Sequence, residues 1–215
     1  MYRIVFLLII NLSLISCQQQ KTKKLDLPYY NDPTFTPIFI KDKATVKNRI
    51  SHTINDFEFL NQDSILIDQK SIENKIHVAN FIFTSCGSIC PRMTTNMKIV
   101  SDSLKNNKDV VFLSYSVTPW IDTPSILKEY TKHKGITNTN WIFLTGSKSD
   151  IYKLARKSYY AEEDIGFSKD STDFLHTEHF ILVDKTKRIR GIYNGTLELE
   201  MLQLIEHIKI LQTSK

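Results

Sequence analysis

Two cysteines, Cys86 and Cys90, are the residues whose type and spacing could most directly do chemistry. They form a Cys-x-x-x-Cys-Pro motif ending at Pro91, between an apolar run and the first turn of an expected helix. Backbone N–H groups are unpaired at a helix start and the helix dipole is positive there, so a nearby thiolate is favoured and its pKa should fall. Two such thiols can close and open a disulfide or hold a soft metal ion.

Other roles for the pair are a structural disulfide and a structural zinc site. A disulfide suits an exported protein, but a bridge between Cys86 and Cys90 closes a very short loop, and short loops gain least from crosslinking. A structural zinc site requires four ligands, and the chain cannot supply a second cysteine pair, because its only other cysteine is Cys17. The spacing therefore favours redox chemistry or an exchangeable soft metal, with the inert bridge as an alternative.

Two of the six histidines, His176 and His179, lie just before an apolar run that predicts a strand. Strand alternation puts them on opposite faces, so we expect only one of them to point at the cysteines. Taken alone, each is more typical of a structural histidine than of a metal ligand. The residues by themselves therefore leave the third donor open.

The elements that must hold these side chains follow from hydrophobic periodicity. Short apolar runs alternate with segments of helical period from about Thr53 onward, and a Ser149 cap is expected to begin one helix. The pattern predicts a hairpin over 54–67, strands over 75–84, 110–113, 141–144, 180–184 and 189–193, and helices over 93–104, 125–134, 151–158 and 201–211. Such alternation, closed by a hairpin and a helix, predicts an α/β fold whose sheet is covered on both faces.

Composition excludes several classes. The chain has 215 residues, with 41% hydrophobic and 24% charged residues, which is typical of a globular protein and not of a disordered one. The net charge of +5 comes from scattered basic residues, so nucleic acid is not an expected partner.

The N-terminal stretch predicts export. Arg3 precedes an apolar run of about a dozen residues, which is too short to span a bilayer and is typical of a secretory signal. The run ends in Leu-Ile-Ser-Cys, which resembles the bacterial lipobox and predicts lipidation of Cys17. We therefore expect a lipoprotein signal peptide over 1–16, a lipid-anchored flexible tether over 17–50, and one domain over 51–215.

Several motifs together resemble the Sco/SenC family from about Ile54 to the last helix. They are the strand that runs into Cys-x-x-x-Cys-Pro, the Thr-Pro-x-x-Asp-Thr loop at 118–123, Leu-Thr-Gly at 144–146, and His-Thr at 176–177. The resemblance implies a thioredoxin-like fold with a central mixed sheet and helices on both faces. It also implies copper ligands at Cys86, Cys90 and His176, although Leu175 stands where the family commonly has Asp, and His179 is the competing imidazole.

By this resemblance, the protein is a membrane-anchored chaperone that delivers copper, as Cu(I) or Cu(II), to the copper A centre of cytochrome c oxidase. The implied partners are the oxidase subunit that carries this centre, a thiol reductant protein, and the membrane bound through the lipid anchor, with the domain facing the periplasm. The alternative is a thioredoxin-like thiol-disulfide oxidoreductase without a metal role. Such enzymes resemble one another in a cis-proline before the strand that here begins near Phe180, and all six prolines of this chain lie earlier. The sequence leaves open whether the protein is also an enzyme, with Cys86 and Cys90 as its catalytic pair.

Overall fold

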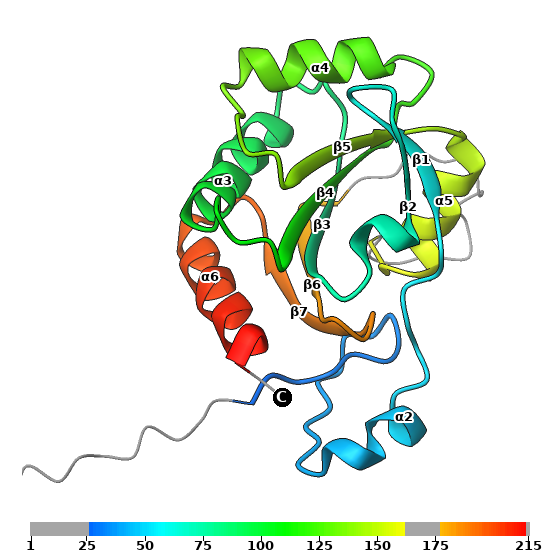
Figure 1. Cartoon of the computed structure of the whole chain (residues 1–215), viewed down its shortest axis with the longest axis vertical. Helices are drawn as coiled ribbons and strands as arrows, with labels where there is room; N and C mark the ends of the chain where they lie inside the picture. Colours follow the sequence, from blue (N-terminus) through cyan, green and yellow to red (C-terminus); the bar gives the residue numbers. More distant parts are fainter. Residues whose placement is uncertain (1–25, 162–176, 214–215) are drawn as a thin grey trace, which may run out of the picture.

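A single mixed β-sheet forms the centre of the protein (Figure 1). The computed structural model describes residues 26–161 and 177–213. The seven strands, in the order β2-β1-β5-β4-β3-β6-β7, are β1 (Glu58–Asn61), β2 (Leu66–Asp68), β3 (Ile76–Ile82), β4 (Val110–Ser116), β5 (Trp141–Thr145), β6 (His179–Val183) and β7 (Ile189–Asn194).

The three central strands are parallel, and the outer strands are antiparallel. β4 pairs in parallel with β3 and β5, whereas β6 pairs antiparallel with β3 and β7, and β1 pairs antiparallel with β2 and β5. Every residue of β3 and β4 is buried, because helices cover both faces of this part of the sheet.

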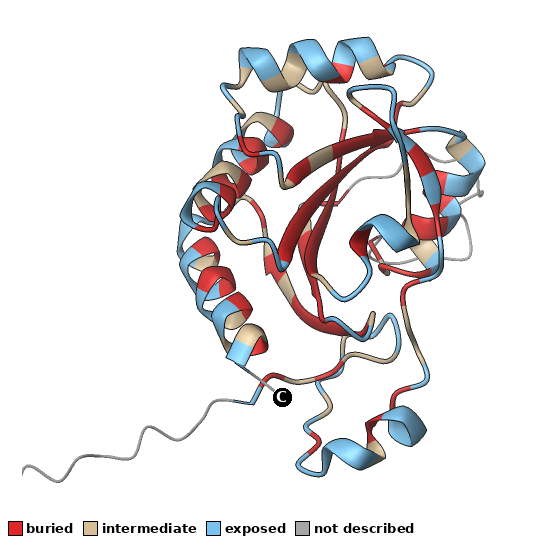
Figure 2. Cartoon of the chain, in the orientation of Figure 1, coloured by how far each residue is buried: buried red, intermediate tan, exposed pale blue. Residues whose placement is uncertain are grey.

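Four longer helices make the two outer layers: α3 (Ile89–Ser103), α4 (Pro124–His133), α5 (Lys148–Lys157) and α6 (Glu198–Thr213). Alternate strand residues point to opposite faces, so Val78 and Phe112 pack with α3, α4 and α6, while Ala79 and Leu113 pack with α5 and β1. Figure 2 shows the buried faces of α3 and α6 turned toward the sheet. The α/β fold with helices on both faces is thereby confirmed.

The expected elements appear in the expected order, with small shifts at their ends. The first strand begins at Glu58, because the backbone N–H of Ile54 donates to Lys187 in the β6–β7 turn and not to a strand. The N-cap of α5 is Ser147, so the predicted cap at Ser149 was wrong. Short helical turns that the sequence did not indicate are η1 (Lys43–Thr45), α2 (Val46–Arg49) and η2 (Gln69–Ile72).

The expectation of a flexible tether over 17–50 does not hold for residues 26–50, which fold onto the domain. Tyr29 pairs with Ile38, and four residues form a small core of their own: Tyr29, Ile40, Val46 and Ile50. The guanidinium of Arg190 in β7 donates to the carbonyls of Leu27 (2.6 Å) and Pro28 (2.9 Å). The prolines of this segment, Pro28, Pro33 and Pro37, alternate with apolar side chains that become buried, such as Tyr29 and Ile40. Residues 17–25, with Cys17, lie outside the described residues, and within the described ranges no helix is long and apolar enough to cross a membrane.

Candidate metal centre

Cys86 and Cys90 lie together where β3 gives way to α3. Cys86 is partly exposed in the connecting segment 83–88, here called the cysteine loop, and its backbone N–H donates to the carbonyl of Phe83 at 3.3 Å. Cys90 is in the first turn of α3, 4% exposed, and packs in the core with Met93. Both thiols are free, and the thiol of Cys90 hydrogen-bonds to the sulfur of Cys86. The two sulfurs are therefore neighbours in the reduced form.

The two thiols differ in acidity. Burial raises the pKa of Cys86, but hydrogen bonds from the N–H groups of Cys90, Ser88 and Ile89 and from the Cys90 thiol together lower it below its ordinary value. Burial raises the pKa of Cys90 to about 12 and outweighs the hydrogen bond from the N–H of Phe83. The lowered pKa expected for both thiols is thus found for Cys86 only, because the sulfur of Cys90 is turned into the core.

A cavity of about 210 Å³ opens beside the two sulfurs. Its wall is formed by residues from β3, the cysteine loop, α3, and the segments that follow β4 and precede β6: Phe81, Phe83, Cys86, Ser88, Ile89, Cys90, Val117 and Thr177. His176 directly precedes Thr177 but lies outside the described residues. His179 does not line the cavity; its ring contacts Phe35 edge-on, with centroids 6.0 Å apart.

The described residues alone do not make a complete metal site. In residues 26–161 and 177–213, no three His, Cys, Asp or Glu side chains come together closely enough to hold a metal ion. Cys86 and Cys90 supply two soft donors, and a third would have to come from another part of the chain.

A buried carboxylate, Asp122, holds the cysteine loop against the next loop of the sheet. It is fully buried and accepts hydrogen bonds from the backbone N–H of Thr84 (3.2 Å) and the hydroxyls of Thr84 (2.5 Å), Ser116 (2.6 Å) and Thr118 (3.0 Å). The Thr-Pro-x-x-Asp-Thr motif at 118–123 did not by itself indicate this role for its aspartate. The sequence signal for this role was the set of hydroxyl residues at the ends of two adjacent parallel strands, Thr84 after β3 and Ser116 and Thr118 at the end of β4.

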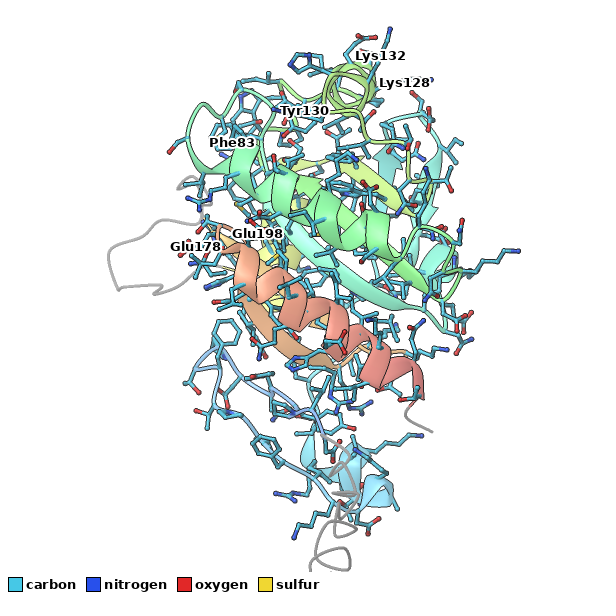
Figure 3. All side chains as sticks on the ribbon, turned by 90° about the vertical axis from the view of Figure 1, so that its left-hand side faces the viewer. Phe83, Lys128, Tyr130, Lys132, Glu178 and Glu198 are labelled. Carbon is cyan, nitrogen blue, oxygen red and sulfur yellow. The ribbon has the colours of Figure 1, made fainter. Side chains whose placement is uncertain are left out.

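The chain that enters β6 is held against α3 through the loop that follows β7. Asn96 in α3 donates to the carbonyl of Gly195 (2.8 Å), and the N–H of Gly195 donates to the carbonyl of Glu178 (2.7 Å). A Cβ on Gly195 would come within 2.9 Å of that carbonyl, so the close approach requires glycine. Figure 3 shows Phe83, Glu178 and Glu198 on the same, left-hand side of that view. These contacts fix Thr177 beside the cysteines.

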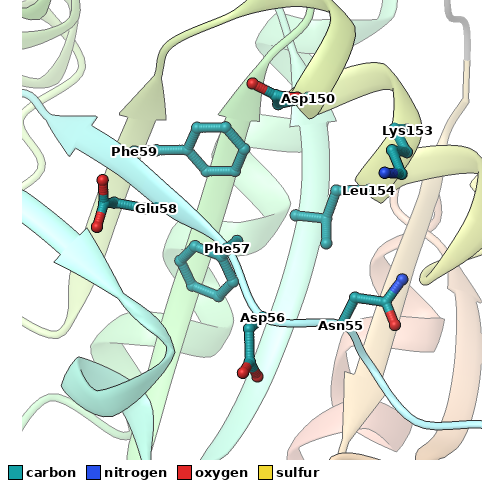
Figure 4. A pocket seen from close by; sticks show the side chains of 8 residues that line it. All are labelled: Asn55, Asp56, Phe57, Glu58, Phe59, Asp150, Lys153 and Leu154. Carbon is teal, nitrogen blue, oxygen red and sulfur yellow. The ribbon is translucent and has the colours of Figure 1, made fainter.

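A larger cavity of about 480 Å³ lies between β1 and α5 (Figure 4). Its polar lining includes Asp56, Glu58, Asp150 and Lys153, over the buried ring of Phe59. Among the described residues that line it there is no thiol or imidazole, so these residues do not offer the soft donors found at the cysteine loop.

Known proteins of one family are similar to this chain in sequence and in fold. The SCO1/SenC family model matches residues 46–211. A SCO1 protein homolog of Bacillus subtilis is 33% identical, over 79% of this chain and 88% of that protein. Among solved structures, a SCO1/SenC family lipoprotein of Bacillus anthracis is 31% identical with a TM-score of 0.66, over 75% of this chain and 95% of that one. Arabidopsis thaliana ScoI with copper bound is 25% identical with a TM-score of 0.58, over 74% of this chain and 98% of that one. The chain belongs to the SCO1/SenC family.

Proposed function

We propose that this protein is a copper chaperone that delivers copper to the copper A centre of cytochrome c oxidase, with Cys86, Cys90 and His176 as its copper ligands. One observation carries the proposal: two reduced, hydrogen-bonded sulfurs line a cavity whose wall includes Thr177, the neighbour of His176. Among the relatives, the Arabidopsis ScoI structure contains copper, and a Stutzerimonas stutzeri relative is named a putative copper-binding protein.

The donor set fits a cargo ion that must be released again. Two thiolates favour Cu(I), and an added imidazole lets the same site accept Cu(II). Three donors leave a coordination position at which a receiving protein can begin ligand exchange. Because both sulfurs must be deprotonated and Cys90 holds its proton strongly, loading releases a proton and is favoured by a higher pH.

His176 is favoured over His179 as the imidazole ligand. Its neighbour Thr177 lines the cavity, whereas His179 does not and contacts Phe35 in the N-terminal segment. The lipid anchor at Cys17, the signal peptide over 1–16 and a periplasm-facing position belong to the same proposal. They are supported by the lipobox-like sequence and by the Bacillus anthracis relative, which is described as a lipoprotein.

A second candidate function, thiol-disulfide exchange on a partner, is favoured by the unequal acidity of the two thiols. In this exchange, the Cys86 thiolate attacks a partner disulfide, forms a mixed disulfide and releases one partner thiol. Cys90 then attacks Cys86 in the mixed disulfide and releases the second partner thiol. The partner gains two electrons and two protons, and Cys86 and Cys90 become a disulfide. A related structure, BsSco, is described as having a disulfide switch. Reduction of the recipient's cysteines before metal delivery would use the same pair.

The test is a copper titration of the reduced protein, with competition by a chelator of known affinity. We expect one copper per chain, loss of binding in Cys86→Ala and in Cys90→Ala, and weakening mainly of the Cu(II) form in His176→Ala. His179→Ala is the matched control and should bind as the unmodified protein does. Binding of one copper that survives the loss of either cysteine would refute the proposal. Reduction of a disulfide peptide without any copper binding would leave only the second function.

The anchor is tested separately by the mass of the mature protein isolated from membranes. We expect an N-terminus at Cys17 that carries diacylglycerol. An unmodified Cys17 would exclude the lipid anchor and would leave the copper assignment untouched.

A further inference from the structure

A strongly basic recess lies where residues 26–50 fold against the β6–β7 turn. It is a cavity of about 260 Å³, and its lining includes five cations and one carboxylate: Lys43, Lys47, Lys185, Arg188, Arg190 and Asp184. In Figure 1, α2 and the N-terminal segment lie at the opposite end of the molecule from α4. This recess takes no part in the proposed copper chemistry.

Three of the five cations have carboxylate partners. Arg190 pairs with Asp184 at 3.1 Å, Lys43 pairs with Asp26 at 2.8 Å, and Lys185 pairs with Asp109 at 3.2 Å. The other two cations are Lys47 and Arg188, for which the described residues supply no ion pair.

Arg188 is the informative residue, because it is only 9% exposed. Its guanidinium donates to two neutral carbonyls, those of Ile50 and Thr186, each at 3.3 Å. Within the described part of the chain, it has no carboxylate within the 4.0 Å of an ion pair. A buried charge without a counter-charge is unfavourable, so an anion that enters the recess would be stabilised there.

The surface around the recess indicates where the anion comes from. Lys41, Lys47 and Arg49 are exposed on or beside α2, and Phe39, two residues before Lys41, is 63% exposed. Exposed aromatic rings among basic side chains are typical of surfaces that rest in the headgroup layer of a membrane. The described chain starts at Asp26, nine residues after Cys17, and nine extended residues span at most about 30 Å. If Cys17 carries the lipid, the recess cannot stand far from the bilayer.

We propose that the recess binds the phosphate of an anionic phospholipid, and that α2 and Phe39 rest on the membrane surface. Cations near an anionic leaflet are attracted additively, so Lys41, Lys47 and Arg49 strengthen the contact. The inference uses the proposed lipid anchor for its reach, and it is independent of copper binding.

This seating would orient the cysteines. The β6–β7 turn lies beside the start of β3, since His77 pairs with Val183, and the cysteine loop follows the end of β3 at Ile82. The six residue steps from Ile76 to Ile82 span about 20 Å. The sulfurs therefore lie at the end of the sheet away from the membrane, where the soluble part of a partner can reach them.

The test is hydrogen exchange of the full lipid-anchored protein in vesicles. One sample has phosphatidylcholine with about 30% phosphatidylglycerol; a second has phosphatidylcholine alone; a third adds inorganic phosphate to phosphatidylcholine. In the anionic vesicles, we expect exchange of the amides of residues 39–50 to slow about tenfold, the effect of a ligand present at about ten times its Kd. Lys47→Glu should remove the slowing, whereas Lys132→Glu, with the same charge change on α4, should keep it.

Arg188→Met tests the buried charge itself, with circular dichroism as the check on folding. If it unfolds the chain, Lys47→Glu still decides. Equal exchange in all vesicles, or slowing that Lys132→Glu removes as fully as Lys47→Glu, would overturn the proposal. Slowing by inorganic phosphate as strong as that by phosphatidylglycerol would overturn the assignment to a membrane lipid. Copper titration of the same vesicles should be unchanged by Lys47→Glu, so loss of the copper function and loss of the lipid site are distinguishable.

Discussion

Replacement of Asp122 by asparagine should loosen the cysteine loop. The Asp122 carboxylate is fully buried and accepts four hydrogen bonds that join the loop after β3 to the loop after β4. In Asp122→Asn, the NH₂ group is best placed at the Oδ1 position, which faces only the Thr84 hydroxyl, because Oδ2 accepts from three donors. The Thr84 hydroxyl must then turn round to accept, and the three bonds at Oδ2 lose their charged acceptor and are weakened.

The size of the effect follows from the kind of bond that is weakened. A hydrogen bond to a charged group contributes about 1.5–3 kcal/mol, and a buried donor left without an acceptor costs about 1–3 kcal/mol. We therefore expect Asp122→Asn to lower the free energy of unfolding by about 3 kcal/mol, measured by urea denaturation of the reduced protein. Thr84→Val, which removes one hydroxyl, should cost about 1–2 kcal/mol, and the double variant should cost less than the sum.

A matched control is Asp109→Asn, because Asp109 is exposed and makes one surface ion pair with Lys185. Its effect should stay below about 0.5 kcal/mol. If Asp122→Asn is as stable as the control, or if the effects of Asp122→Asn and Thr84→Val simply add, the argument that this carboxylate fixes the cysteine loop is refuted.

Three further predictions follow from the same structure. In the reduced protein at pH 8, iodoacetamide should alkylate Cys86 at least about 100-fold faster than Cys90, by mass spectrometry, because Cys90 is buried and its pKa is raised to about 12; equal rates would contradict the assignment. Burial lowers the pKa of His77 from 6.5 to about 3, so below pH 6.5 only the unfolded chain binds this proton, and stability should fall by about 1.4 kcal/mol per pH unit toward pH 3. His77→Gln should flatten the urea-denaturation profile over this range, and an unchanged slope would be the contrary result. Gly195→Ala should lower the free energy of unfolding by about 1–3 kcal/mol, because its methyl group meets the carbonyl of Glu178. A Tm equal to that of the unmodified protein would contradict this, since the loop would then have shifted to relieve the contact at no cost.

The order of elements was predictable because the residues that form the core recur along the chain at the spacing of strands and helices. Apolar runs such as 110–113 become fully buried central strands, and Met93, Met97 and Val100 recur at helical spacing because α3 packs one face on the sheet. The cysteine pair was found for the same reason, since its position at a strand-to-helix junction is a local property of the sequence.

The features that were missed depend on contacts between distant residues. The fold of residues 26–50 is set by Arg190, more than 130 residues later, and no local pattern shows that partner. The raised pKa of Cys90 follows from the direction of its sulfur into the core, whereas the motif alone predicts two equivalent thiols. Asp122 acquires its role only when two parallel strands bring Thr84 beside it.

The central claim is that two sulfurs and the His176 ring hold one copper ion. Its most direct test is electron paramagnetic resonance of the Cu(II)-loaded protein, labelled with ¹⁵N at histidine, beside the variants His176→Ala and His179→Ala. We expect coupling to one histidine nitrogen that disappears in His176→Ala and persists in His179→Ala. Coupling that persists without His176, or that disappears only without His179, would contradict the account.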